Sequence, residues 1–559
     1  MRLPSFIHLS LLVVVLPCAE SAFARKTPPP STGSVGAGTP DGENIIKARA
    51  KGQKRLFEWV PFSKEAFERA KTEHRFVLLD GAAEWCHWCH VMDETTYADP
   101  RVGAVLSSRF VAIRVDIDER PDIGERYAEY GWPATILFSP EGEEIGKLRG
   151  YVESERLLHV LDELGSRKGG GTVVRTPDVG DMPASVETLS WIGAAETLSL
   201  DEFYDEEQGG WGHKQKLAVG TAVELEVRRW RHGDLAAAKR VLFTLKQQRA
   251  ILDPVWGGLY QYSAATDWSA PHFEKLMAFQ AANIEAYARA AALPDESGSE
   301  KNPALDDARH IAEYVDQFLS AESGAFHPNQ DADAGAHDRS VPFVDGHVFY
   351  AKDDAGRRRL GMPRVDPHVY PRETAMAIAA LATLYEVSHE ARWLVRAKRA
   401  AEAIQASFVL PDGTVIHEAE NKEGPFLLGD GAWTGYALAR LGEVSGEAIY
   451  RDRAVVVARA LRKNFDDGHG GVLGGTPDVH AAGVFAHPAL SFSDAVAAAR
   501  CHAALGRIHH DSAQTSRARE VLAAIATPRA LSGAGRFVGD FLLALDEVGK
   551  YPWLPAPAK

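Results

Sequence analysis

The stretch from Ala82 to Met92, AAEWCHWCHVM, places Cys86 and Cys89 two residues apart, with a histidine directly after each cysteine. Thiolates attack disulfides and bind metal ions, so three roles are open: a redox pair, part of a metal site, or a structural crosslink. A tetrahedral zinc site usually takes a second ligand pair, and the sequence has no other close cysteine pair. A crosslink over so short a loop constrains little of the unfolded chain. The spacing therefore favours a redox-active disulfide that needs no other cofactor.

The two cysteines should differ in role if Cys86 begins a helix that follows a strand. At that position backbone N–H groups and the helix dipole stabilise a thiolate. We therefore expect Cys86 to be the nucleophile and Cys89, one turn further on, to be the resolving thiol. His87 and His90 are expected to tune the pair by adding positive charge. The alternatives are that both histidines are solvated, or that they join the cysteines on a zinc ion.

Other residues of this region fit a redox site. Asp80 ends a strand six residues before the first cysteine, where a buried carboxylate can take the proton of Cys89; the alternative is a turn or helix cap. Pro133 opens a strand and is a candidate cis peptide that would lay backbone beside the sulfurs, or else an edge proline. Neighbouring tryptophans are expected to pack around the pair and shield it: Trp85, Trp88 and Trp132.

The chain begins with the pattern of a secretory signal. Arg2 supplies positive charge, the segment Ile7 to Pro17 is mostly apolar and too short to span a membrane, and Ala22-Phe23-Ala24 matches a cleavage site. We expect residues 1–24 to be removed from an exported protein, periplasmic or secreted, that does not span a membrane. A lipid anchor at Cys18 is the alternative.

Composition excludes several classes of protein. With 559 residues, of which 45% are hydrophobic and 25% charged, the chain is long enough for more than one globular domain. Its net charge of −15 argues against a nucleic-acid-binding protein, which needs a basic face. The sequence contains no phosphate-binding loop, dinucleotide fingerprint or H-E-x-x-H motif. The last cysteine, Cys501, lies in an alanine-rich helical stretch and is expected to be buried.

Hydrophobic patterning predicts an α/β domain over residues 44–165. We expect strands at residues 76–80, 110–116, 133–138 and 145–150. We expect helices at residues 63–74, from the cysteines to about Leu106, at 123–130 and at 154–164. The order βαβα followed by ββα predicts a mixed sheet with one parallel crossover and one hairpin.

The remaining segments differ in composition. Residues 25–43 are predicted to be a flexible leader, 166–185 a linker and 551–559 a tail. Residues 186–550 contain long helical segments separated by glycine loops such as EEQGGWGH and DPVWGGLYQY. Divided by six, this span gives roughly 61 residues per unit, the size of a helical hairpin with its loops. We expect six hairpins closed into a ring; an open solenoid is the alternative.

Three segments resemble a thioredoxin domain: VLLDGAAEWCHWCHVM, FVAIRVDIDE and YGWPATILFSPEGEEIGKLRGY. They particularly resemble the C-terminal domain of the electron-transfer protein DsbD. The segment CHWCHVM together with VDIDERPDI is similar to the YyaL/spermatogenesis-associated thioredoxin-domain family. GGLYQYSAATDWSAPHFEKLMAFQAANIEAY and GAFHPNQDADA resemble that family's second domain. The resemblance implies a thioredoxin-like domain followed by an all-α (α/α)6 toroid of the six-hairpin glycosidase type.

Toroids of this type often process sugars, and glycoside hydrolysis needs two carboxyl groups at a set separation. The toroid candidates are His272, Glu274, Asp331, Asp333, Glu373 and Asp430. Tryptophans that could stack on sugar faces are Trp211, Trp256, Trp268 and Trp433. Each residue has a structural alternative: aspartates beside glycine cap turns, tryptophans fill cores, and His272 can simply hydrogen-bond to Glu274.

Three functions of different class follow. The favoured one is an exported thiol-disulfide oxidoreductase whose toroid binds or presents a substrate. Its partners would be protein thiols or disulfides and an upstream electron donor. A histidine inside C-x-x-C often accompanies oxidising pairs, but the AEWC lead-in and Asp80 are more typical of reductases, which favours a reductase or electron relay. The alternatives are a carbohydrate-active hydrolase or epimerase that binds a saccharide in the toroid, and a binding scaffold without turnover.

Overall fold

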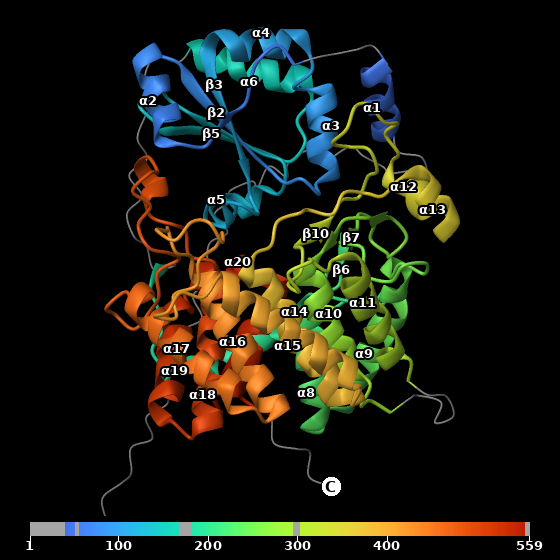
Figure 1. Ribbon diagram of the computed structural model, residues 1–559, viewed down its shortest axis with the longest axis vertical. Helices are drawn as coiled ribbons and strands as arrows, with labels where there is room; N and C mark the ends of the chain where they lie inside the picture. The colour runs from blue at the N-terminus through green and yellow to red at the C-terminus, as the bar shows by residue number, and fades with distance from the viewer. Residues whose placement is uncertain (1–39, 51–54, 167–180, 295–301, 554–559) are drawn as a thin grey trace, which may run out of the picture. The chain divides into compact units, whose positions relative to one another are not determined.

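Four strands of the first domain have nearly the bounds that the apolar runs predict, and a fifth joins them at one edge. The computed structural model describes residues 40–50, 55–166, 181–294 and 302–553 (Figure 1). The sheet contains β1 (Val60–Pro61), β2 (Phe76–Ala82), β3 (Phe110–Asp116), β4 (Ala134–Phe138) and β5 (Glu144–Arg149) in the order β1-β3-β2-β4-β5. β3 is parallel to β1 and β2, whereas β4 is antiparallel to β2 and β5. The predicted combination of a parallel crossover and a hairpin is therefore confirmed.

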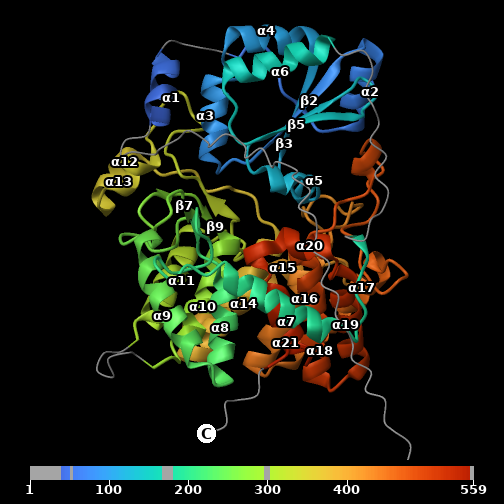
Figure 2. The same ribbon diagram turned by 180° about the vertical axis from the view of Figure 1, so that it is seen from behind.

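Helices pack on both faces of this sheet (Figures 1 and 2). They are α2 (Lys64–Glu73), α3 (His87–Thr95), α4 (Pro100–Arg109), α5 (Pro121–Tyr127) and α6 (Ser154–Ser166), with a 3-10 turn at Ala128–Tyr130. The first helix, α1 (Pro40–Ala50), packs on α3 instead. The prediction of one helix from the cysteines to about Leu106 is wrong. Asp99 caps a new helix and Pro100 occupies its first turn, a position where the missing N–H costs nothing.

The structure also corrects the predicted bounds of the leader and of the tail. α1 begins at Pro40, so the last residues of the predicted leader, 40–43, are helical. The predicted tail is packed at its start: Tyr551 is buried, and the Trp553 ring stacks on His232 with centroids 3.7 Å apart. The predicted signal peptide, Cys18 and the leader up to residue 39 lie outside the described residues. Of the predicted linker, residues 167–180 also lie outside them.

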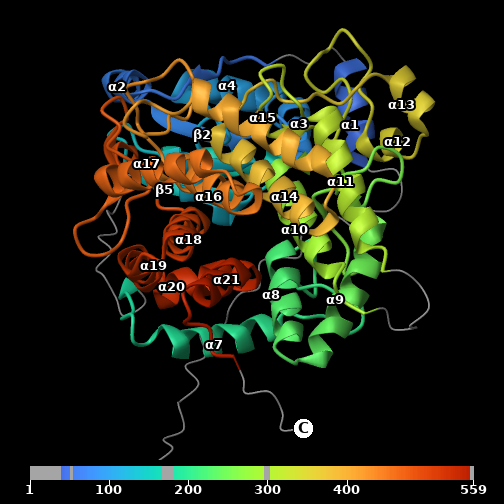
Figure 3. The ribbon, with the colours of Figure 1, turned by 60° about the horizontal axis from the view of Figure 1, so that its bottom comes forward.

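The second domain is a closed ring of six helical hairpins (Figure 3). The inner helices are α8 (Gly220–Arg231), α10 (Met277–Ala290), α14 (Pro371–Ser388), α16 (Leu428–Ser445), α18 (Phe492–His509) and α21 (Gly539–Glu547). Their outer partners are α9 (Leu235–Gln248), α11 (Ala304–Phe318), α15 (Ala391–Ser407), α17 (Ala448–Phe465), α19 (Ser512–Ile525) and α7 (Leu189–Glu202). Each inner helix contacts the next, and α21 contacts α8, so the ring closes. This closure excludes the open solenoid.

The last hairpin joins the two ends of the toroid. Figure 2 shows α7, from the start of the domain, beside α21 at its end. Gly193 permits this approach, because a Cβ there would lie 2.9 Å from Leu545. The inner helices are alanine-rich because they contact neighbours on both sides and an outer helix behind, as in α18, where Ala495 to Ala499 are all buried.

Two glycine loops of the toroid are held by buried lysines. In the first, Lys216 Nζ donates to Asp205 Oδ2 at 2.6 Å and to the carbonyl of Gly209. In the second, Lys275 Nζ donates to Asp253 Oδ2 at 2.7 Å, and Arg357 pairs with the same carboxylate. A glycine loop exposes backbone carbonyls, and a buried ammonium satisfies several of them at once. The second loop leads through β8 (Pro271–His272) and β9 (Lys275–Leu276) to the candidate site.

The described residues of both domains belong to one compact unit. Contacts between the domains are therefore part of its structure. Among these residues no helix is both long and apolar enough to cross a membrane.

Candidate functional site at the junction of the two domains

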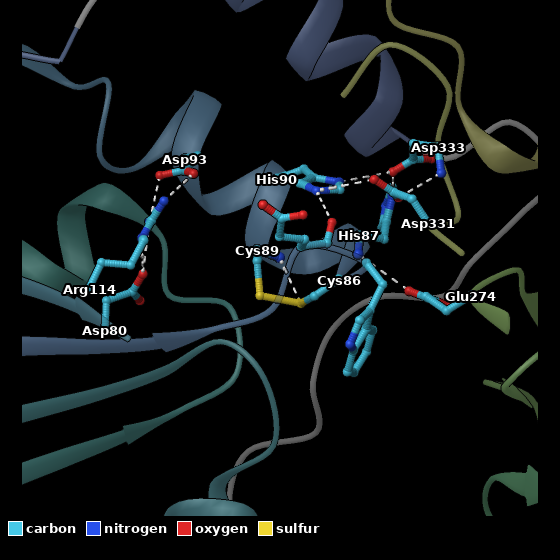
Figure 4. Close-up of a disulfide and its surroundings, with 12 residues drawn as sticks. Asp80, Cys86, His87, Cys89, His90, Asp93, Arg114, Glu274, Asp331 and Asp333 are labelled. Atoms are coloured by element: carbon cyan, nitrogen blue, oxygen red, sulfur yellow. Dashed lines mark hydrogen bonds and ion pairs between the residues drawn. A yellow bond between two sulfur atoms is a disulfide. The ribbon is translucent and has the colours of Figure 1, made fainter. Parts of the chain in front are cut away.

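Cys86 and Cys89 form a disulfide at the start of α3 (Figure 4). Cys86 is the N-cap of the helix, and its Sγ accepts a hydrogen bond from the Cys89 N–H at 3.1 Å. A helix N-terminus leaves N–H groups free for an anion, so the same contact would stabilise a Cys86 thiolate after reduction. Both side chains are buried, at 4% and 5% exposure. The predicted positions of the two cysteines on the helix are confirmed.

Hydrophobic groups surround the disulfide. The Trp132–Pro133 peptide is cis, as the sequence predicts. Trp85 is buried beside the cysteines, and Trp88 and Trp132 pack against the same cluster, as does Leu276 of the toroid. The toroid thus helps to bury the disulfide through Leu276.

Asp80 is buried beneath the site, and it has two side-chain partners. The guanidinium of Arg114 donates two hydrogen bonds to Asp80 Oδ2, at 2.8 and 3.0 Å, and the Tyr97 hydroxyl donates to Oδ1. Arg114 also bridges to Asp93 on α3 (Figure 4). Burial raises the pKa of Asp80, against the opposing pull of Arg114. Asp80 therefore combines the buried setting of a proton acceptor with a fixed cationic partner.

His87 points into the toroid and is not solvated. Its Nδ1 lies 2.7 Å from Asp333 Oδ2, and its backbone N–H donates to Glu274 Oε1 at 3.3 Å (Figure 4). Burial disfavours the imidazolium, but the charge and hydrogen bond of Asp333, helped by Glu274 and Asp345, outweigh it and raise the pKa of His87 to about 10. Acids of the other domain therefore favour the protonated form of the histidine that follows Cys86.

His90 also faces the toroid. Its Nε2 lies 3.0 Å from the Glu84 carbonyl and 3.6 Å from Asp331 Oδ2, and its Nδ1 lies 3.5 Å from Asp333 Oδ2. His337 Nε2 also approaches the Glu84 carbonyl and Asp331 Oδ2, at 2.9 Å from each oxygen. Burial lowers the pKa of His90, but the nearby aspartates outweigh it and raise the value to about 9. With both histidines turned to the toroid and both sulfurs bonded, the zinc set of Cys86, His87, Cys89 and His90 does not form.

Glu274 is a buried carboxyl with an unused acceptor. Oε2 makes no hydrogen bond, and burial raises the pKa of Glu274 to about 7, although the His87 charge opposes the shift. His272, two residues earlier, stacks on Tyr262 with ring centroids 4.3 Å apart and also faces Trp88. Burial, followed by the charge of His87, lowers the pKa of His272 to about 3. Glu274 therefore accepts the His87 backbone N–H with one oxygen and keeps the other buried without a partner among the described residues.

We expect Glu274→Gln to change how stability depends on pH. Folding raises the pKa of the Glu274 carboxyl from 4.5 to about 7. The protonated carboxyl therefore stabilises the folded state below pH 4.5, and this stabilisation is lost as the pH rises to 7. The shift corresponds to roughly 3 kcal/mol. Thermal melts between pH 5 and 8 should show the variant gaining stability over wild type as pH rises. Glu420→Gln, at an exposed position, is the control, and equal pH profiles for wild type and Glu274→Gln would contradict the prediction.

A second connection between the domains involves Asp430. His417 Nδ1 lies 3.0 Å from Asp430 Oδ2, and its Nε2 lies 3.1 Å from the Asp118 carbonyl, just after β3. Trp85 Nε1 donates to the Asp118 carboxylate at 2.8 Å. Burial lowers the pKa of His417, but Asp430 outweighs it and raises the value to about 9. Asp430 therefore supports the thioredoxin-like domain through His417. Glu373 accepts a hydrogen bond from Arg372, and its charge adds to the field that raises the pKa of His417.

The candidate sugar-stacking tryptophans do not gather at the junction. Trp211, Trp256 and Trp268 are buried in the toroid core. Trp433 is partly buried, and its Nε1 donates to Asp494. Cys501 is buried in α18, as expected.

A cavity of about 620 Å³ reaches the disulfide from the Cys89 side. Its wall includes Glu84, Cys89, His90 and Arg114 of the first domain and His337 of the toroid. Cys86 does not line this cavity. A partner that enters it would meet Cys89 and a mixture of charged groups.

Two groups of side chains near the disulfide have ligand atoms close enough to share a metal ion. One comprises His90, Asp331 and His337, and the other His87, Asp333 and Asp345. The toroid candidates His272, Glu274, Asp331 and Asp333 are brought together with His87 and His90, whereas Glu373 and Asp430 lie near His417.

Several residues of the site were not predicted from the sequence. Arg114 interrupts the apolar strand FVAIRVD, which is the signal of a buried ion pair. His337, Asp345 and His417 lie in loops far along the chain, and no local pattern links them to the cysteines.

Comparison with known proteins agrees with this architecture. Residues 50–158 match a family model described as Thioredox_DsbH, a protein of unknown function, DUF255. Human spermatogenesis-associated protein 20 is 30% identical over 314 residues, which cover 50% of this chain and 39% of that protein. The chain thus spans about two fifths of the length of this curated relative. The thiol:disulfide interchange protein DsbD of Ralstonia nicotianae is 31% identical over 150 residues, covering 26% of this chain and 22% of DsbD.

Among solved structures, a D-mannose isomerase aligns with a TM-score of 0.47 and 14% identity, covering 67% of this chain and all of that one. By sequence, half of the chain is similar to spermatogenesis-associated protein 20, about a quarter of it is similar to DsbD, and residues 50–158 match the Thioredox_DsbH model.

Proposed function

We propose that the chain is an exported thiol-disulfide oxidoreductase, periplasmic or secreted, that uses Cys86 and Cys89 as a reductase or electron relay. The observation that carries the proposal is the Cys86–Cys89 bond at the N-terminus of α3, with the Cys86 sulfur already accepting a helix N–H. Similarity to DsbD over 150 residues, together with the match of residues 50–158 to the Thioredox_DsbH model, supports this class of chemistry. The proposed reaction uses the redox-active disulfide and needs no other cofactor.

In the reducing direction the Cys86 thiolate attacks a partner disulfide. One partner sulfur leaves as a thiolate, and a mixed disulfide joins the partner to Cys86. Cys89 then loses its proton, for which Asp80 is the proposed acceptor, and attacks the Cys86 sulfur. This releases the second partner thiolate and closes the Cys86–Cys89 bond. A dithiol donor returns two electrons by the reverse exchange, so that the pair cycles.

The toroid is proposed to hold the reactive helix and shape access to it. Asp333 and Glu274 contact His87, and Asp331 and His337 contact the His90 side. The acids expected to process a sugar are thus engaged with the thioredoxin-like domain. Among the described residues none of these contacts favours carbohydrate chemistry, so a saccharide-processing toroid is not proposed as a second function.

A redox titration of the mature protein tests the proposal. The protein is equilibrated in glutathione buffers, free thiols are alkylated, and the mass shift counts them. We expect one reversible two-electron transition that links Cys86 and Cys89, with a potential that shows whether the pair donates or accepts electrons. A pair that stays oxidised or reduced across the range of glutathione potentials would contradict the proposal.

A further inference from the structure

Four potential metal ligands converge beside the disulfide, from two segments of the chain, residues 84–90 and 331–337. They are the Nε2 atoms of His90 and His337, Oδ2 of Asp331 and the backbone carbonyl of Glu84. His90 and Glu84 belong to the thioredoxin-like domain, and the other two residues belong to the toroid loop that follows β10 (Asn329–Gln330). We infer that these four atoms form a binding site for a divalent transition-metal ion such as Zn²⁺. This inference goes beyond the proposed function and does not depend on it.

The spacing of the four atoms suits a tetrahedral ion. Zinc binds nitrogen and oxygen at about 2.0–2.2 Å, which separates neighbouring ligands in a tetrahedron by roughly 3.3–3.6 Å. The His90 Nε2 atom lies 3.6 Å from Asp331 Oδ2 and 3.0 Å from the Glu84 oxygen. His337 Nε2 lies 2.9 Å from both oxygens. Small outward shifts would admit an ion at the centre of the four atoms.

Hydrogen bonds satisfy only part of the bonding capacity of these four atoms. Each imidazole Nε2 carries at most one hydrogen, yet His337 Nε2 has two oxygens at equal distance. The rings of His90 and His337 are nearly perpendicular, with centroids 5.0 Å apart, and the Nε2 atoms of both rings face Asp331 Oδ2 and the Glu84 carbonyl. A divalent cation would satisfy both nitrogens and both oxygens together.

The ligands are oriented by other groups, as at protein metal sites. Asp331 Oδ1 accepts the Asp333 N–H, which leaves Oδ2 to face the histidines. The other nitrogen of His90 makes no hydrogen bond to a described residue, but it lies 3.5 Å from Asp333 Oδ2, within ion-pair distance of a carboxylate that would orient a metal-bound imidazole.

His337 lies on a fixed loop. Ala334 and Val344 pair across the loop through two backbone hydrogen bonds, at 2.9 and 3.0 Å. Gly335 adopts a φ of +70°, and a Cβ there would lie 2.4 Å from the Pro342 carbonyl, so a glycine is needed to form this turn. The Arg49 guanidinium donates to the carbonyls of Gly335 and Ala336.

The chemistry of the donors indicates the class of ion. Two imidazoles with a carboxylate and a carbonyl suit zinc or another first-row transition metal, whereas calcium and magnesium prefer oxygen ligands alone. His90, His337 and Glu84 line the 620 Å³ cavity, so an ion has a path from solvent. The neighbouring group of His87, Asp333 and Asp345 differs, because all its members are buried and His87 is already paired with Asp333 at 2.7 Å.

Metal binding to the full mature chain tests the inference. The protein is stripped with chelator, dialysed, and titrated with Zn²⁺ by calorimetry and with Co²⁺ by visible absorption. We expect one ion per chain and Co²⁺ bands typical of tetrahedral coordination. His337→Ala and Asp331→Asn should each weaken binding at least tenfold, and Asp333→Asn, which removes an orienting carboxylate, by roughly 10- to 100-fold.

Two controls separate this site from metal binding elsewhere in the chain. Cys86→Ser/Cys89→Ser should retain the ion, because the proposed ligands include no sulfur. His368→Ala should also retain it, since His368 is another toroid histidine paired with a buried aspartate, at 2.6 Å from Asp366. The inference is overturned if no stoichiometric ion binds, if His337→Ala binds as wild type does, or if the double cysteine variant loses the ion. Circular dichroism of each variant checks that the fold is intact.

Discussion

Replacing Cys86 by serine should reduce thiol-disulfide exchange to the uncatalysed rate, whereas replacing Cys89 should trap the partner. Cys86 is the N-cap of α3, and its sulfur accepts the Cys89 N–H, so the helix end stabilises its thiolate. Without Cys89 nothing resolves the mixed disulfide that Cys86 forms. The measurement is the yield of mixed disulfide with a model peptide that contains a disulfide, read by mass spectrometry, together with turnover in an insulin-reduction assay.

Access to the sulfurs makes this result informative. The cavity at the junction reaches Cys89 and not Cys86, while Leu276 of the toroid packs over the pair. A mixed disulfide that accumulates on Cys89 in Cys86→Ser, and not on Cys86 in Cys89→Ser, would show that access and not helix electrostatics selects the nucleophile. Cys501→Ala is the control, because this buried thiol in α18 lies outside the site. It should leave exchange unchanged.

Asp253→Asn should destabilise the toroid by about 3–5 kcal/mol, the typical cost of removing one partner from a buried ion pair. The carboxylate of Asp253 receives Lys275 Nζ at 2.7 Å and two Arg357 nitrogens at 2.7 and 2.9 Å. All three side chains have no solvent exposure. Asparagine keeps the shape but leaves two buried cations without a counter-charge. Urea denaturation at pH 7, followed by tryptophan fluorescence, measures the change.

The same variant should affect the candidate site. Lys275 follows Glu274 directly, and β9 pairs with β10 just before Asp331. Release of Lys275 should therefore loosen both segments, which hydrogen exchange of residues 271–277 and 329–333 would report. Asp412→Asn is the matched control, because its pair with Lys463 is solvent-exposed at 48% and 68% and should contribute less than about 1 kcal/mol. Equal destabilisation by the two variants would contradict the stabilising role of the buried cluster.

Local chemistry made much of the first domain predictable. Phe76 to Asp80 and Phe110 to Asp116 are apolar runs typical of buried strands, and Ser63 caps the helix that it was expected to cap. The four-residue C-x-x-C segment brings its sulfurs within reach on one helical turn. Prediction failed at Pro100, where a short-range signal for a new helix was present but was outweighed by the apolar pattern around it.

Long-range contacts could not be predicted in the same way. His87 and Asp333 are 246 residues apart, and Asp118 and His417 are 299 apart. The sequence marks each of these residues as titratable, but their pairing depends on how the closed ring places its loops against α3. The alternative that His87 and His90 are solvated was therefore wrong for a reason that no local pattern contains.

The sequence by itself determined the disulfide pair, the strand and helix order of the first domain, the cis proline and the division into two domains, because each depends on short-range periodicity, turn chemistry and composition. Only the tertiary structure decided which acids contact the two histidines, that Asp80 is paired with Arg114, and that the disulfide opens to a cavity on its Cys89 side. These features arise from side chains of distant segments that share one buried volume, where a charge must find a partner.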